Sequence, residues 1–181
     1  MRRVNLRKPK TDVEVKPVSP EKMRERTFQR AAKLLAAKPR SIAELRERLL
    51  EGPSTNKEVV ETVIERLREY GYLDDDRFAL GYAQWKVKQR PIGRRRLERD
   101  LTMKKVERTV ADQALDQVFE ETPEEELIDR AIEKRTRLRG LPSTRAETKS
   151  LFDHLLRQGF SFELVSDKVR AASRIDLDDP E

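Results

Sequence analysis

Pairs of leucines four residues apart recur along this chain at intervals of roughly fifty residues. In the second and third copies, the apolar residues that follow the second leucine also recur at the same offsets. Such self-similarity is typical of proteins built from stacked structural units, because each unit alone is too small to bury much apolar surface. The pairs are Leu45 and Leu49, Leu97 and Leu101, and Leu151 and Leu155.

The residues between the leucine pairs carry the apolar spacing of amphipathic helices. Val60, Ile64 and Leu67, for example, occupy the i, i+4 and i+7 positions of one helix face. Glycines and prolines interrupt this spacing so that each copy contains three helical segments, and no segment alternates polar and apolar residues as a strand would. The sequence therefore predicts an all-α fold of three tandem three-helix repeats.

The charge content of the chain indicates an elongated molecule. Charged residues make up 41% of the sequence and hydrophobic residues 36%. This apolar content is small for one compact globule, but it suits narrow helical repeats with a large wetted surface. Complete disorder is the alternative, and the sustained helical periodicity disfavours it. We expect the repeats to stack into an elongated curved rod.

Turn signals and composition divide the chain into five segments. Residues 1–20 contain prolines and mixed charge without an apolar period, which predicts a flexible basic arm. The three repeats are predicted over residues 21–73, 74–121 and 122–173. Residues 174–181 are predicted to form a short acidic tail.

A motif at the boundary between the first two repeats predicts how they are joined. Its glycine can take a left-handed conformation and close one helix, and the Tyr-Leu pair can pack back on that helix. One of the two aspartates is expected to cap the next helix, whose buried face would carry the aromatic pair. The motif residues are Gly71, Tyr72, Leu73, Asp74, Asp75, Phe78 and Tyr82.

Basic residues are densest in the second repeat, and they form the candidate partner-binding site. On the helix that starts near Gly93, Arg95 and Arg99 share one face, whereas Leu97 and Leu101 share another. Such a basic stripe could contact an acidic protein surface or DNA phosphates. A solvated helix face without a partner is the alternative. The candidate residues are Lys86, Lys88, Arg90, Arg94, Arg95 and Arg99.

The residues needed for catalysis or for a His/Cys metal site are missing from the sequence. The chain has no cysteine, and His154 is its only histidine. There is no glycine-rich phosphate-binding loop, and the acidic run that starts at Asp74 is better explained by helix capping than by Mg²⁺ binding. We therefore expect neither enzymatic activity nor a metal or cofactor. Trp85, the only tryptophan, is expected in the core rather than in base stacking.

The stretch from Gly71 to Ala79, followed by Tyr82, resembles the signature of the bacterial RecX family. The resemblance extends over about residues 26–173 and includes the leucine pairs and the repeat layout. One departure concerns the loop after Leu101, where family members often have glycine and this chain has Lys104 and Lys105. A left-handed residue there costs about 1 kcal/mol more than glycine would.

The resemblance implies a non-enzymatic regulator of the recombinase RecA. Proteins of this family lie along the groove of the RecA–DNA filament and contact adjacent RecA protomers. They inhibit filament growth, ATP hydrolysis, strand exchange and the coprotease activity of RecA in DNA repair and the SOS response. A cytoplasmic monomer that binds RecA, and single- or double-stranded DNA only weakly, is the corresponding expectation for this chain. No apolar run is long enough to span a membrane.

Two other functions are compatible with the sequence. Three-helix units resemble helix-turn-helix domains, so the basic helix with Arg95 and Arg99 could be the recognition helix of a DNA-binding regulator. This alternative predicts sequence-specific binding to duplex DNA without RecA. The chain could also be a helical scaffold for an unknown partner, in which case it would have no effect on RecA.

Overall fold

The computed structural model describes residues 19–53 and 55–173, and the part described is helical without any strand. The predicted basic arm, apart from Ser19 and Pro20, and the acidic tail lie outside the described residues. The helices are α1 (Pro20–Ala37), α2 (Ile42–Leu50), α3 (Lys57–Glu69), α4 (Asp75–Gln89), α5 (Arg94–Met103), α6 (Arg108–Glu121), α7 (Glu124–Arg139), α8 (Arg145–Gln158) and α9 (Phe162–Ala172).

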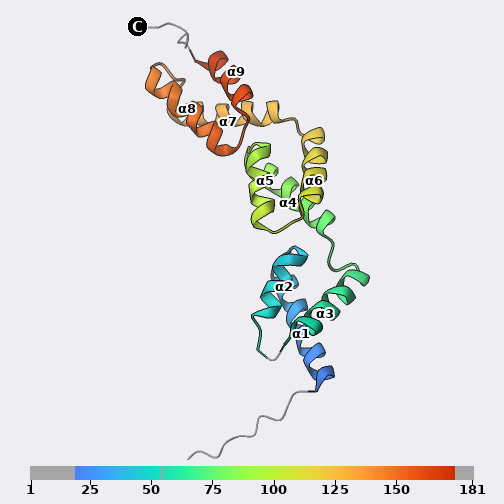
Figure 1. Ribbon diagram of the computed structural model, residues 1–181. Helices are drawn as coiled ribbons and strands as arrows, with labels where there is room; N and C mark the ends of the chain where they lie inside the picture. The colour runs from blue at the N-terminus through green and yellow to red at the C-terminus, as the bar shows by residue number, and fades with distance from the viewer. Residues whose placement is uncertain (1–18, 54, 174–181) are drawn as a thin grey trace, which may run out of the picture.

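These helices form three groups that follow one another along an elongated molecule (Figure 1). Helices α1–α3 lie at one end, α4–α6 in the middle and α7–α9 at the other end, and we call these groups the first, second and third repeats. All six leucines of the recurring pairs are at most 2% exposed. The predictions of an all-α fold and of an elongated arrangement of repeats are confirmed.

The apolar core is divided unevenly among the repeats. One buried cluster lies within the first repeat and ends at Leu73, after α3. A second cluster runs without interruption from Ala79 in α4 to Val169 in α9. The second and third repeats therefore share one packed core, whereas the first repeat has a core of its own and is joined to the second by polar contacts.

The motif at Gly71 forms the connection from α3 to α4 largely as expected. Gly71 has a φ of 70°, so it adopts the left-handed conformation that closes the helix. Leu73 is buried, and the Asp74 side chain caps α4 by accepting a hydrogen bond from the backbone N–H of Arg77 at 2.9 Å. The Tyr72 side chain packs less closely on α3 than predicted: it is 65% exposed and lies edge-on to the Tyr70 ring, while its backbone N–H donates to the carbonyl of Leu67 at 2.9 Å.

The aromatic residues of α4 lie further out than predicted. The seam of α4 that enters the core consists of Ala79, Ala83 and Val87. Phe78 and Tyr82 lie beside this seam, half-buried and stacked at 6.0 Å between ring centroids. Trp85 was predicted in the core, and this is wrong, because its side chain is 55% exposed. Small residues line the seam because α4 and α6 pack closely, which leaves no room there for large rings.

Candidate partner-binding site at the joint of the second and third repeats

The start of α5 is joined directly to the end of α8. The backbone N–H of Gly93 donates to the carbonyl of Gln158 at 3.0 Å, and that of Arg95 donates to the carbonyl of Gly159 at 3.1 Å. The first N–H groups of a helix have no partner within the helix, and neither do its last carbonyls. The N–H groups at the start of α5 therefore provide hydrogen-bond donors for the carbonyls at the end of α8. These backbone contacts define the orientation of α5 relative to the third repeat.

A glutamate from α7 completes this joint. The Glu124 carboxylate accepts a hydrogen bond from the backbone N–H of Arg94 at 2.9 Å. Burial raises the pKa of Glu124, and the hydrogen bond from Arg94 offsets part of that increase. The positive end of α5 is thus occupied by a side chain of the neighbouring repeat and by two carbonyl groups.

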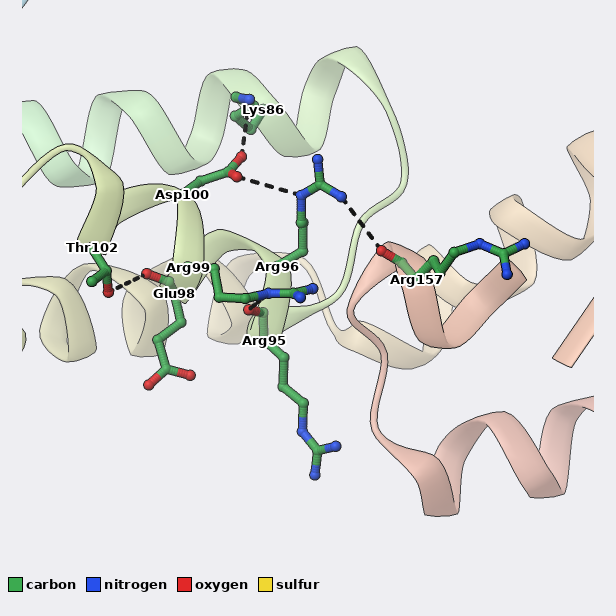
Figure 2. Close-up of polar contacts among 8 residues, drawn as sticks. All are labelled: Lys86, Arg95, Arg96, Glu98, Arg99, Asp100, Thr102 and Arg157. Carbon is green, nitrogen blue, oxygen red and sulfur yellow. Dashed lines mark hydrogen bonds and ion pairs between the residues drawn. The ribbon is translucent and has the colours of Figure 1, made fainter. Parts of the chain in front are cut away.

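Beside the joint, the buried carboxylate of Asp100 on α5 binds two cations, Arg96 from the same helix and Lys86 from α4 (Figure 2). Asp100 is 4% exposed and binds Lys86 at 3.0 Å and Arg96 at 3.4 Å. Arg96 also donates to the carbonyl of Arg157 at 3.5 Å, so this face of α5 is tied to both α4 and α8. Burial lowers the pKa of Lys86, but its hydrogen bonds with Asp100 and Tyr82 more than reverse that effect, and the net pKa is raised.

Arg95 and Arg99 of α5 point away from Asp100 (Figure 2). Arg95 and Arg99 are both exposed, and the Arg99 guanidinium donates to the carbonyl of Arg95 at 3.2 Å. Leu97 and Leu101 are fully buried. The charged face of α5 is therefore open to a partner while its apolar face belongs to the core.

The six candidate residues divide into two sets. Lys86 and Arg94 are paired with carboxylates, Arg94 with Asp116 at 2.7 Å. Lys88 and Arg90 are exposed at the end of α4, next to the loop that leads into α5. Together with Arg95 and Arg99 they form what we call the exposed basic set.

Lys104 and Lys105, at the end of the basic stretch, join the first two repeats. Lys104 binds Glu44 of α2 at 2.8 Å, and Lys105 forms an ion pair with Glu47. The carbonyl of Lys104 accepts a hydrogen bond from the Ser41 hydroxyl at 2.5 Å. Lys105 has a φ of 58°, and it is the only non-glycine residue with a positive φ in the described part of the chain.

The first repeat is also anchored through the motif. Asp75 does not cap its own helix but accepts a hydrogen bond from the backbone N–H of Ile42 at 2.9 Å, across the boundary between the repeats. Ser41 caps α2 through the N–H of Glu44, but the Glu44 carboxylate binds Lys104 instead of closing a capping box. Sequence reasoning missed the roles of the Asp75 and Glu44 carboxylates because their partners lie far apart in the chain.

The described residues offer no group of three or more His, Cys, Asp or Glu side chains that could hold a metal ion. Asp74 and Asp75 are used for capping and for the contact between repeats. Within residues 19–53 and 55–173, no helix has the length and apolar character that crossing a membrane requires.

Comparisons with known proteins identify the family to which this sequence is similar. The family model described as "RecX, second three-helix domain" matches residues 74–115. The regulatory protein RecX of Streptomyces coelicolor is 31% identical over 149 residues, which cover 82% of this chain and 78% of that protein. The RecX protein of Treponema pallidum (strain Nichols) is 38% identical over 104 residues. That match spans 63% of the Treponema protein, so it covers less than two thirds of the relative's length.

Solved structures show the same fold. The crystal structure of RecX from Lactobacillus salivarius superimposes with a TM-score of 0.72 and covers 84% of this chain and 97% of that chain. Its sequence identity is 18%, so this likeness concerns the fold.

Proposed function

Because this chain belongs to the RecX family, we propose that it is a non-enzymatic regulator that binds the RecA–DNA filament and inhibits RecA. The observation that carries the proposal is the exposed basic set beside a rigid joint between repeats. Arg95 and Arg99 lie on a helix whose orientation is defined by backbone contacts, so their spacing is set before a partner arrives. Preorganised charges lose less conformational entropy on binding than charges on a mobile segment.

The elongated shape suits a filament groove. A rod of three repeats can contact adjacent RecA protomers at several points, and weak contacts on one body add up through effective concentration. A protein bound in this way would oppose filament growth, ATP hydrolysis, strand exchange and coprotease activity, and so act in DNA repair and SOS control. The site of action would be the cytoplasm, with the protein acting as a monomer.

The geometry of α5 favours this function over helix-turn-helix recognition of duplex DNA. A recognition helix places its N-terminal residues against base edges in the major groove. Here the start of α5 is covered by Gln158 and Gly159 of the third repeat and by Glu124. The exposed arginines lie along the side of the helix, which is suited to an acidic protein surface or a phosphate backbone.

The test is the ATPase activity of RecA on single-stranded DNA, with this protein titrated below the RecA concentration. Wild-type protein should inhibit. The double variant Arg95→Glu/Arg99→Glu should need an about tenfold higher concentration for half-inhibition, equivalent to about 1.4 kcal/mol of binding free energy. Both side chains are exposed, so circular dichroism should show an intact fold.

A matched control carries the same charge reversal on the first repeat. Lys33 and Lys38 are exposed in or next to α1, and Lys33→Glu/Lys38→Glu changes the net charge by the same amount. This control should inhibit like wild type at moderate salt. Equal inhibition by the Arg95/Arg99 variant and the control would exclude the exposed basic set as the contact, and absence of any inhibition by wild type would reject the function.

A further inference from the structure

A second group of cations lies in the third repeat, on α7 and α8. On α8, Ser150, His154 and Arg157 share one helix face, and the Arg135 guanidinium of α7 donates a hydrogen bond to Ser150 on that face. Burial lowers the pKa of His154 most, and the charges of Arg135, Arg157 and Arg139 lower it further. Burial and then the charges of Arg139 and Arg157 lower the pKa of Arg135 as well. The two helices therefore bring four basic side chains together.

No carboxylate among the described residues forms an ion pair with any of these arginines. Arg135 instead donates to the Ser150 hydroxyl at 2.9 Å and to its carbonyl at 3.4 Å, which holds its guanidinium against α8. Elsewhere in the chain, Asp100 neutralises a comparable convergence of cations. Like charges held together without a counter-ion repel one another, so the cluster is suited to an anionic ligand.

The surface beside these residues is hollowed. A cavity of about 220 Å³ lies between α7 and α8 and is lined by Arg135, Arg139 and Ser150. Glu147 also borders it, but its carboxylate accepts hydrogen bonds from Ser143 and Thr144 and serves to cap α8. The cavity thus offers guanidinium donors and a hydroxyl group to a small anion.

We propose that Arg135, Arg139, Arg157 and His154 form a binding site for a phosphate group. Planar guanidinium groups bind phosphate oxygens through paired hydrogen bonds, which makes arginine the side chain best suited to this ligand. The ligand could be a phosphodiester of a nucleic-acid backbone or the phosphate of a free nucleotide, and both present the same chemistry. The site is separate from the exposed basic set and does not depend on the function proposed above.

The single histidine provides a direct reporter. His154 is the only histidine of the chain, so its imidazole proton resonances can be followed by NMR in the untagged full-length protein. Inorganic phosphate, titrated at constant ionic strength, should shift these resonances with saturation. In Arg139→Gln/Arg157→Gln the apparent Kd should rise about tenfold, because two charge-assisted contacts are lost. Both arginines are exposed, so the fold should be retained.

The control is Arg137→Gln, on the same helix. Arg137 pairs with Glu133 at 2.6 Å and is not among the charges that act on His154, so its loss should leave the Kd within about twofold. Absence of a saturable shift in wild type, or an equal shift in the double variant, would overturn the proposal. Titration with ATP and with an oligothymidylate then distinguishes the sources, since tighter binding of either one identifies the ligand. No RecA is present, so the outcome is independent of filament inhibition.

Discussion

Gly93 and Gly159 meet so closely that a Cβ atom on Gly93 would lie 2.4 Å from the carbonyl carbon and oxygen of Gly159. A side chain on Gly93 would therefore displace the backbone of Gly159, and a Cβ atom on Gly159, which has a φ of 92°, would lie 2.4 Å from the backbone nitrogen of Arg96 in α5. This contact allows the hydrogen bonds between the start of α5 and the end of α8. The shared core of the second and third repeats therefore depends on two glycines at the surface of contact.

Gly93→Ala should accordingly destabilise the protein. Separating the two backbones strains the joint and weakens its hydrogen bonds, and we expect a loss of about 2 kcal/mol in the free energy of unfolding. Urea denaturation followed by circular dichroism measures this change. An unchanged midpoint would show that the joint can open at little cost.

Gly81→Ala should have the opposite effect and serves as the matched control. Gly81 lies inside α4 and is exposed. A Cβ atom added there would meet nothing within 4 Å apart from the backbone of its own helix. Alanine reduces the entropy lost on forming the helix, so the free energy of unfolding should rise by about 0.5 to 1 kcal/mol. The same urea series gives the value, and a decrease would contradict the open environment of this position.

Asp100→Asn should be one of the most damaging substitutions of a charged residue. It would leave Lys86, whose side chain is 17% exposed, without a counter-ion and would also weaken the contact with Arg96. Removing one partner from a largely buried ion pair lowers the free energy of unfolding, and we expect a loss of about 2 to 3 kcal/mol. The loss is smaller than for a fully buried pair because Arg96 is partly solvated. Thermal and urea unfolding would measure the loss.

Asp116→Asn provides the comparison for Asp100. Its partner is Arg94, but Asp116 is 71% exposed, so solvent screens the pair. The change should remain within about 0.5 kcal/mol of wild type. Similar losses for the two variants would mean that burial does not determine the strength of these ion pairs.

The contact between Asp75 and Ile42 should make stability depend on pH. Burial raises the pKa of Asp75, and the hydrogen bond from Ile42 opposes this only in part. The folded protein then binds the proton more tightly than the unfolded chain, whose aspartate pKa is about 3.9. The stability contribution of this group is full below that value and is lost as pH rises through the raised folded pKa.

Asp75→Asn tests this sign. Asparagine keeps an oxygen that can accept the Ile42 N–H but carries no charge, so at neutral pH the variant should be at least as stable as wild type. That advantage should disappear as pH falls below about 4, where Asp75 is protonated. Asp75→Ala, which lacks the acceptor, should lose about 1 kcal/mol at neutral pH. Urea denaturation midpoints of the three proteins across this pH range measure these differences. An Asn variant that is less stable than wild type at neutral pH would refute the raised pKa of Asp75.

The sequence alone determined the helical repeats and the local connection from α3 to α4. Apolar spacing within each helix is a local property, so the leucine pairs, the closing residue Gly71 and the cap Asp74 could all be recognised from their neighbours in the chain. The separation of Arg95 and Arg99 from Leu97 and Leu101 follows from the same helical geometry.

Only the tertiary structure decided which charges are paired, and which side chains outside the apolar helix pattern are buried. Trp85 is exposed because α6 covers a different face of α4, and Lys104 binds Glu44 because the chain returns to the first repeat sixty residues later. Burial and ion pairing depend on distances through space between helices that are remote in the sequence. The residues around each charge do not encode those distances, which is why Asp100 and Asp75 acquired their roles only in the folded chain.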